Sequence, residues 1–314
     1  MKNILVTGGT GYVGTVLVNE LLRQGHVVTV VDTMWFGDYL EEHKNLTKIK
    51  TNILEIDNIP MANVDTVFHL ANIANDPTGD LNSKLTWEVN ALASKLLVEK
   101  AIDNNVKQFV YASSGSVYGI KEEAQVTEDL DLVPISDYNK TKMISERVLS
   151  SYEDKINIIS IRPATVCGYS PRMRLDVSVN MLTMQALQNK KITVFGGKQV
   201  RPNIHILDMI GVYIHFLNNN ELTGIYNAGF ENISILDIAE KVAKKIDAEI
   251  IVTPSNDPRS YRLNSDKLLN TGFSPKYGVD YAIAEIIEKY NSGILKDEDR
   301  YYNLKVMDKL GIGA

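Results

Sequence analysis

The feature of this sequence that most limits its fold is a glycine turn placed directly after the first apolar run. Lys2–Thr7 is short and rich in apolar residues, which suits a strand buried on both faces. Gly8, Gly11 and Gly14 follow at three-residue spacing and open a segment with helical periodicity. Glycines placed in this way let the backbone approach a pyrophosphate, and the helix N-terminus adds N–H groups and positive potential. The segment therefore predicts a dinucleotide site.

Strand-like and helical segments then alternate along the first half of the chain. The segments with one or the other periodicity are Val13–Gln24, which we expect to end at Gly25, His26–Val31, Thr66–Leu70, Ala91–Asn104, Gln108–Ala112 and Ile156–Arg162. This alternation predicts the α/β class, with a doubly wound parallel sheet.

The pattern loosens after Gly168, where a polar segment broken by proline begins. Further elements are expected at 177–188 (helix), 192–195 and 201–206 (strands), and 203–217 and 226–229, which return to the main sheet. We predict a dinucleotide-binding domain of residues 1–167, to which residues 203–229 return. Residues 168–202 and 230–314 would form a smaller, mixed α/β C-terminal lobe that binds the substrate.

Composition excludes several classes of protein. The formal net charge of −6 gives the 314-residue chain no general attraction for nucleic acid or an anionic membrane. Cys167 is the only cysteine, so we expect neither a disulfide nor a thiolate metal cluster, and no metal. No apolar stretch approaches the ~18 residues of a membrane helix, and the first strand begins without an apolar signal region. We expect a cytoplasmic protein.

Asp32 lies eighteen residues beyond Gly14, at the end of the second predicted strand. A carboxylate in this position accepts hydrogen bonds from the adenosine ribose hydroxyls and repels a 2′-phosphate. No arginine or lysine follows until Lys44, so NAD is favoured over NADP. The alternative is that Asp32 only caps the next turn.

Tyr138 and Lys142 are four residues apart, so on a helix they point the same way. A phenol with an ordinary pKa near ~10 is a poor base at neutral pH. We expect the charge of Lys142, with that of the cationic ring of oxidised NAD, to keep Tyr138 partly ionised. Lys142 would also hydrogen-bond the nicotinamide ribose. Ser113–Gly119, at the end of a strand, offers a third polar group. The pattern predicts hydride chemistry on an alcohol or ketone; the alternative is a solvated helix face.

Taken together, these motifs resemble those of the extended short-chain dehydrogenases/reductases, in particular the nucleotide-sugar epimerase/dehydratase family, over nearly the whole chain. Ser114, four residues before Tyr118 of the Val-Tyr-Gly signature, falls at the family's catalytic serine or threonine, and Tyr138 and Lys142 match its catalytic pair. The resemblance implies a Rossmann sheet. It also implies cofactor contacts by Gly8, Gly11, Tyr12, Val13 and Gly14 of the turn, by Asp32, by Asn52 and Ile53 flanking adenine, by Leu70 and Ala71, and by Asn90, beside Tyr138 and Lys142.

The same resemblance implies a nucleoside-diphosphate sugar as substrate. Thr165 stands where the family has an asparagine that holds the diphosphate, which puts this contact in doubt. Arg201 and Arg259 match positions of diphosphate-binding arginines, although surface ion pairing is the alternative, and Asn180 and Phe195 match nucleobase contacts. Arg172 or Arg174 would contact the nucleotide or a larger sugar, or order their own loop. Asn72, Asn75 and Asp76 are placed to face the sugar.

The residues after Ser114 bear on the reaction. Dehydratases of the family carry acidic residues there, whereas this chain has Gly115 and Ser116, which argues against 4,6-dehydration. We expect an epimerase that oxidises a sugar hydroxyl, most often at C4, and returns the hydride to the opposite face, in surface polysaccharide biosynthesis. The alternatives are a dehydrogenase or keto reductase for GDP-linked hexoses or heptoses, a dehydrogenase for small alcohols, and an NAD-sensing protein without catalysis.

By the same resemblance we expect a homodimer. The helices predicted at Ala91–Asn104 and around Tyr138–Ser151 would pair with their counterparts in a four-helix bundle.

Overall fold

The computed structural model describes residues 1–255 and 260–313, and in these residues the main sheet has seven parallel strands. In spatial order they are β10 (Gly224–Ala228), β6 (Asn157–Pro163), β5 (Gln108–Ala112), β4 (Thr66–His69), β1 (Asn3–Thr7), β2 (Val27–Asp32) and β3 (Leu46–Lys50). The direction of the strand order reverses between β1 and β4, and this reversal creates a crevice at the carboxyl ends of the two strands. The predicted α/β class with a doubly wound parallel sheet is confirmed.

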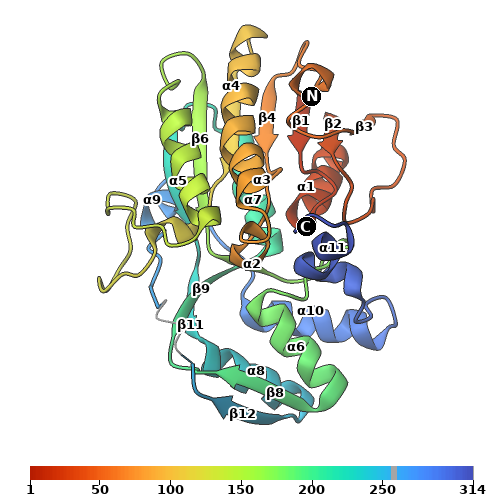
Figure 1. Cartoon of the computed structure of the whole chain (residues 1–314), viewed down its shortest axis with the longest axis vertical. Helices are drawn as coiled ribbons and strands as arrows, with labels where there is room; N and C mark the ends of the chain where they lie inside the picture. The colour runs from red at the N-terminus through yellow and green to blue at the C-terminus, as the bar shows by residue number, and fades with distance from the viewer. Residues whose placement is uncertain (256–259, 314) are drawn as a thin grey trace.

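Helices cover both faces of the main sheet (Figure 1). One face carries α1 (Tyr12–Arg23) and α7 (Ile206–Asn218), and the other carries α4 (Ala93–Asp103) and α5 (Asp137–Ser150). Gly25 has a φ of +83° just beyond the end of α1, as expected for the glycine that follows a helix.

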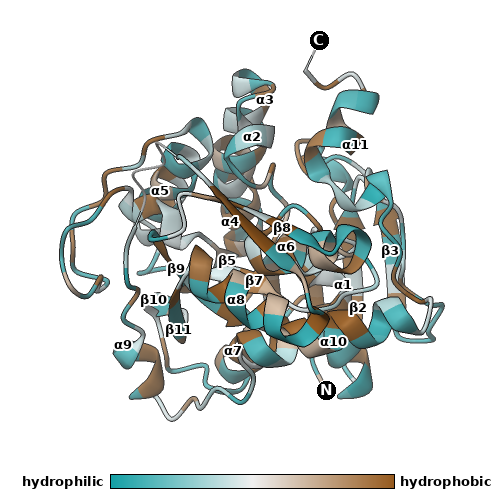
Figure 2. Ribbon diagram, turned by 90° about the horizontal axis from the view of Figure 1, so that it is seen from below, coloured by the Kyte–Doolittle hydropathy of each residue, from teal (hydrophilic) through white to brown (hydrophobic). Residues whose placement is uncertain are grey.

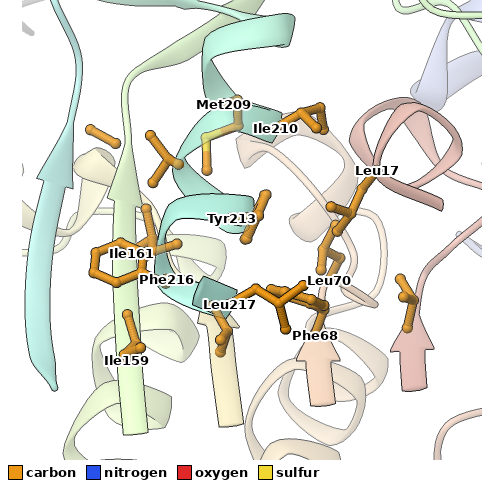
Figure 3. Close-up of a cluster of buried hydrophobic side chains, with 14 of the residues drawn as sticks. Leu17, Phe68, Leu70, Ile159, Ile161, Met209, Ile210, Tyr213, Phe216 and Leu217 are labelled. Carbon is orange, nitrogen blue, oxygen red and sulfur yellow. The ribbon is translucent and has the colours of Figure 1, made fainter. Parts of the chain in front are cut away.

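The alternation of side chains along β1 shows how the core is divided. Val6 packs with the helices α1 and α7, whereas Leu5 packs with α4 and α5, and both are fully buried. Figure 3 shows the first of these clusters, in which Leu17 of α1 and Tyr213 of α7 lie beside Phe68 of β4. A strand that is covered on both faces needs apolar residues throughout, which explains the continuous apolar runs.

Shorter elements connect this framework. They are α2 (Asp76–Gly79), α3 (Ser83–Trp87), α9 (Asp266–Leu269), α11 (Asn303–Lys309), and the 3₁₀ turns Ile56–Asn58, Gly115–Tyr118 and Asp299–Tyr301. The helix predicted from Ala91 differs in detail. Its first two residues belong to a π-helical turn, Glu88–Leu92, that leads into α4. Turns of this kind are often found near functional sites.

The second lobe lies below the main sheet in Figure 1 and in front of it in Figure 2. Its elements are α6 (Ser178–Asn189), α8 (Ile235–Ile246), α10 (Val279–Asn291), the paired strands β8 (Lys191–Phe195) and β12 (Glu249–Thr253), and the small sheet of β7 (Thr165–Cys167), β9 (Val200–His205) and β11 (Glu231–Ser234). Figure 2 shows hydrophilic and hydrophobic residues along both α8 and α10, as expected for helices with one buried face. The chain returns to the main sheet with α7 and β10, but β9 pairs outside it.

The C-terminal segment comes back to the first domain. Helix α11 lies beside α2 (Figure 1), and the Nδ2 of Asn82 donates a hydrogen bond of 3.2 Å to the carbonyl of Ile312. Across the part of the chain that the structure describes, no helix has both the length and the apolarity needed to span a membrane.

Candidate active site

A cavity of about 600 Å³, which we call the cleft, lies at the carboxyl ends of the main strands. Its walls come from both lobes: the glycine turn and the ends of β1, β2, β4 and β5 on one side, and the segment after β6 on the other. The predicted site residues that line the cleft are Gly8, Gly11, Tyr12, Val13, Gly14, Asp32, Asn52, Ile53, Leu70, Ala71, Asn72, Asn75, Asp76, Ser114, Tyr138, Lys142, Thr165, Arg172, Arg174 and Arg201.

The glycine turn packs so closely that side chains are excluded from it. A Cβ on Gly8, whose φ is +73°, would lie 2.6 Å from the backbone nitrogen of Ala71, and one on Gly14 would lie 2.2 Å from the carbonyl oxygen of Gly8. Gly11 is the residue just before α1 and makes no side-chain hydrogen bond that caps the helix. The N–H groups of the first helical turn therefore stay available at the cleft. This arrangement fits the pyrophosphate of a dinucleotide.

The structure shows Asp32 in the turn-holding role that was the alternative, and it also places the carboxylate at the cleft. Asp32 lines the cleft, and its carboxylate accepts hydrogen bonds from the backbone N–H of Met34 at 2.8 Å and of Thr10 at 3.1 Å. A carboxylate has about four acceptor positions, so capacity remains for the predicted ribose hydroxyls. Asp32 therefore holds the glycine turn in place, and its contact with the cofactor stays a prediction.

We expect the charge of Asp32 to set the preference between NAD and NADP. Replacing it in Asp32→Asn keeps the shape and removes the repulsion of a 2′-phosphate, so the ratio of the NADP Kd to the NAD Kd should fall about tenfold. Titration of both cofactors measures this ratio. Asp38→Asn is the matched control, because Asp38 pairs with Lys48 away from the cleft. If the ratio of the NADP Kd to the NAD Kd is unchanged in Asp32→Asn, Asp32 only holds the glycine turn in place.

Tyr138 and Lys142 lie in the first two turns of α5 and reach the cleft together. Ser136 caps this helix by accepting a hydrogen bond of 3.2 Å from the N–H of Asn139. Ser114 lines the cleft with Tyr138, and its side chain acts to lower the pKa of the Tyr138 phenol. The Nζ of Lys142 donates to the carbonyl of Ala112 at 2.6 Å and lies 5.9 Å from the centre of the Tyr138 ring. The three predicted catalytic side chains are therefore brought together at the end of β5.

The charges around Tyr138 differ from the expectation. Burial raises the pKa of Tyr138, with the Ser114 hydrogen bond opposing this shift, Asp76 adding to it and Arg174 opposing it. Burial also lowers the pKa of Lys142 to about 7, against the opposing effect of Glu146. Of the two charges predicted to keep the phenol partly ionised, that of Lys142 does not offset the effect of burial on the pKa of Tyr138, and the effect of oxidised NAD stays a prediction.

A buried ion pair lies beneath this triad. Arg162 of β6 donates to the carboxylate of Glu146 of α5 at 2.7 Å and 3.0 Å, and both side chains are at most 3% exposed. Ser113 also donates to Glu146, and Arg162 reaches the Tyr118 hydroxyl at 2.7 Å. Glu146 was not predicted as a site residue, although its position four residues after Lys142 places it on the same side of the helix.

Ser114 belongs to a chain of hydroxyl groups. Its Oγ lies 2.7 Å from that of Ser116, and Ser116 in turn donates to the side chain of Asn139. Gly115 is confined as well, since a Cβ there would lie 3.1 Å from the carbonyl of Pro163. Neither position after Ser114 offers an acid, but the carboxylate of Asp76, from the loop after β4, also lines the cleft.

Four of the predicted residues are not placed in the cleft. Asn90 is buried beside it, where it accepts from the N–H of Ile73 at 2.8 Å and donates to the carbonyl of the same residue at 3.1 Å. It therefore shapes the loop after β4 and does not line the cofactor site. Phe195 is the last residue of β8 and lies away from the cleft, with most of its side chain exposed. Arg259 lies outside the described residues.

Asn180, the fourth, acts behind the cleft wall. Its side chain accepts from the N–H of Gly168 at 3.0 Å and donates to the carbonyl of Arg174 at 2.9 Å and the hydroxyl of Tyr12 at 3.1 Å. It is fully buried, so it orders the segment that carries Arg174 and does not meet a nucleobase directly. The amide found by resemblance is thus a positioning residue.

The described residues contain no group of three or more His, Cys, Asp or Glu side chains able to hold a metal ion. Cys167 is buried, and burial raises the pKa of its thiol, so it is no nucleophile at neutral pH.

Comparison with known proteins agrees with this geometry. The profile of the NAD dependent epimerase/dehydratase family matches residues 4–229. The chain belongs to this family. The cofactor is accordingly NAD, as Asp32 and the glycine turn predicted, and the resemblance seen in the sequence is confirmed.

Individual relatives and solved structures are similar to the chain over most of its length. It is 34% identical over 257 residues to an uncharacterized UDP-glucose epimerase of Bacillus subtilis, covering 76% of this chain and 80% of that protein. It is 28% identical to the UDP-glucose 4-epimerase of Lactobacillus helveticus, covering 90% and 94%. The structure matches the UDP-glucuronic acid 4-epimerase of Bacillus cereus, in complex with UDP-glucuronic acid and NAD, with a TM-score of 0.80 and 27% identity over 92% of this chain and 99% of that one. The Thermus thermophilus UDP-glucose 4-epimerase with NAD gives a TM-score of 0.81, with 25% identity and coverage of 92% and 99%.

Proposed function

We propose that the protein is a 4-epimerase of a UDP-hexose. The observation that carries this proposal is the meeting of Ser114, Tyr138 and Lys142 with the glycine turn in one cleft, since this joins an acid/base group to a dinucleotide site. The curated relatives from Bacillus subtilis and Lactobacillus helveticus are named as epimerases of UDP-glucose, which supports UDP over other nucleotides.

In this proposal Tyr138 takes the proton of the sugar hydroxyl while Ser114 orients that hydroxyl. The glycine turn and Asp32 would hold NAD, which would supply the hydride acceptor and, when oxidised, a positive charge in the cleft. Because burial raises the pKa of Tyr138, the phenol holds its proton until such a charge is near. Lys142, held by the carbonyl of Ala112, would hydrogen-bond the nicotinamide ribose.

The substrate would enter from the second lobe. Arg201 of β9 lies at the cleft and offers a planar fork of donors for a diphosphate, with Thr165 nearby on β7. The transient keto sugar would rotate within the cleft and take the hydride back on its other face. Gly115 and Ser116 support epimerisation over dehydration, because they leave no acid directly after Ser114.

The proposal includes a homodimer. The segments that were expected to pair carry the exposed apolar side chains Leu92, before α4, and Ile144 of α5, and Trp87 of the preceding helix α3 is exposed as well. A partner's copy of the same surface would cover them. We further propose that the protein acts in the cytoplasm, in surface polysaccharide biosynthesis.

Incubation of the purified protein with NAD and a panel of UDP-, GDP-, CDP- and dTDP-hexoses and GDP-heptoses tests this function. Ion-exchange chromatography with mass detection should show a new peak of unchanged mass from a UDP-hexose. A product two hydrogens lighter would identify a dehydrogenase, and loss of water a dehydratase. Turnover of a GDP-sugar alone would replace UDP with GDP. Binding of NAD without any turnover would favour a sensing protein.

A further inference from the structure

Arg172, in the segment after β7, is buried without a carboxylate bonded to it. Its side chain is among the largest fully buried ones, and its residue exposure is 2%. Nη1 donates to the carbonyl of Met173 at 3.0 Å and Nη2 to the amide oxygen of Asn303. Nε has no hydrogen-bond partner among the described residues. Burying a cation costs free energy unless an anion pairs with it, so we expect an anion to bind this guanidinium.

The neighbouring charges do not supply this anion. Asp176 accepts a hydrogen bond of 2.8 Å from the Nε of Arg174, so the nearest carboxylate of this segment already has a partner. A second donor of Arg174, Nη2, also lacks a partner among the described residues. Burial and then the charge of Arg174 lower the pKa of Arg172 to about 10, as expected for two guanidinium groups that share one carboxylate.

The position of Arg172 assigns it to one end of the cleft. Its guanidinium carbon lies 4.2 Å from the ring centre of Phe36, in the loop that follows Asp32, and Asp32 acts on it electrostatically. Asp32 is hydrogen-bonded to Thr10 of the glycine turn, so Arg172 lies on the side of the cleft where the adenosine ribose and the pyrophosphate are expected to meet. The charge that acts on Tyr138 is that of Arg174.

The segment that carries Arg172 is tied to the glycine turn. Ser170 donates to the carbonyl of Tyr12, the first residue of α1, at 2.8 Å, and the Tyr12 hydroxyl donates to the carbonyl of Gly168 at 2.7 Å. Arg172 and the turn thus line the same cleft. Asn303 of α11 holds the far side of the guanidinium, so the C-terminal helix positions it.

We propose that Arg172 binds the pyrophosphate of the NAD cofactor, opposite the N-terminus of α1. Phosphate oxygens accept from the planar guanidinium fork, and the free Nε–H provides a donor for them. The sequence had suggested that Arg172 contacts the substrate nucleotide or a larger sugar; the contact with Phe36 places it on the cofactor instead. The inference needs the NAD site alone and does not depend on the sugar chemistry.

Titration of the full-length protein, freed of bound cofactor, with adenosine, ADP, NAD and UDP tests this role. Arg172→Gln should raise the Kd of ADP and of NAD about 10- to 100-fold and leave that of adenosine, which has no phosphate, unchanged. Arg147→Gln is the matched control, because Arg147 is exposed on α5 outside the cleft. Its Kd values should equal those of the unmodified protein.

Three results would overturn the proposal. An equal rise for adenosine and ADP would make Arg172 a structural residue, a rise for UDP alone would assign it to the substrate diphosphate, and no change would remove it from binding. Arg172→Lys keeps the charge without the fork and should give an intermediate rise for ADP. If Arg172→Gln does not fold, the ratio of the ADP Kd to the adenosine Kd in Arg172→Lys decides in the same way.

Discussion

Tyr138→Phe should lower kcat about 10³-fold while NAD remains bound. General acid/base catalysis contributes roughly 10²- to 10⁴-fold, and the phenol of Tyr138 is the proposed acid/base group in the cleft that it shares with Ser114. The ring of Tyr138 stays in place in this variant, so the fold and the cofactor cradle should be retained. Steady-state kinetics on the UDP-hexose that the protein converts, together with measurement of bound NAD, test this.

The control for Tyr138→Phe is Tyr152→Phe. Tyr152 follows the end of α5 and donates to Glu99 at 2.7 Å, far from the cleft, so its loss should leave kcat within about twofold. A Tyr138→Phe enzyme with normal kcat would contradict the assignment of the acid/base group. A variant that lost NAD as well would point to a role of the hydroxyl in binding.

Glu146→Gln should lower the free energy of unfolding by about 3 to 5 kcal/mol. The change leaves the buried Arg162 guanidinium without its counter-charge and weakens the bond from Ser113. Glu99→Gln is the matched control, because the Lys95–Glu99 pair has the same 2.7 Å separation but lies on the surface. An exposed pair contributes at most about 1 kcal/mol. Denaturant unfolding of both variants measures the difference.

The same substitution should shift the pH dependence of catalysis. Glu146 opposes the effect of burial on Lys142, whose pKa is about 7, so its loss should lower this pKa further. Lys142 would then lose its proton at a lower pH, and the alkaline limb of the rate profile should move in that direction. Equal stability losses in Glu146→Gln and Glu99→Gln, or an unmoved alkaline limb, would contradict the account of this network.

The strands of the main sheet could be predicted because most of them are short apolar runs buried on both faces. β3 was missed for a physical reason: it lies at the edge of the sheet, and its sequence Leu46–Lys50 keeps polar residues on a half-exposed surface. The π-helical turn at Glu88–Leu92 was missed as well, because it has the same apolar spacing as the helix it opens.

The site residues show a similar division. The glycine turn, Asp32 and the pair Tyr138 and Lys142 could be predicted, since each depends on a local motif at a strand end or on one helix. Arg172 could not be assigned to one end of the cleft, because its place depends on contacts with Phe36 and Asn303, which are far away in the chain.

Three further assignments show the limit of local patterns. Asn90 and Asn180 were identified as contact residues, yet both are turned toward buried backbone groups. The pKa of Tyr138 was misjudged because spacing along a helix gives proximity and leaves burial unknown.

In the proposed reaction one hydride leaves C4 of the sugar and returns to the same carbon. UDP-glucose that carries deuterium at C4 can be incubated with the purified protein and analysed by mass and proton NMR. We expect UDP-galactose that keeps its deuterium at C4, with no net formation of NADH. Deuterium lost to water, or a product formed in step with NADH, would contradict this proposal.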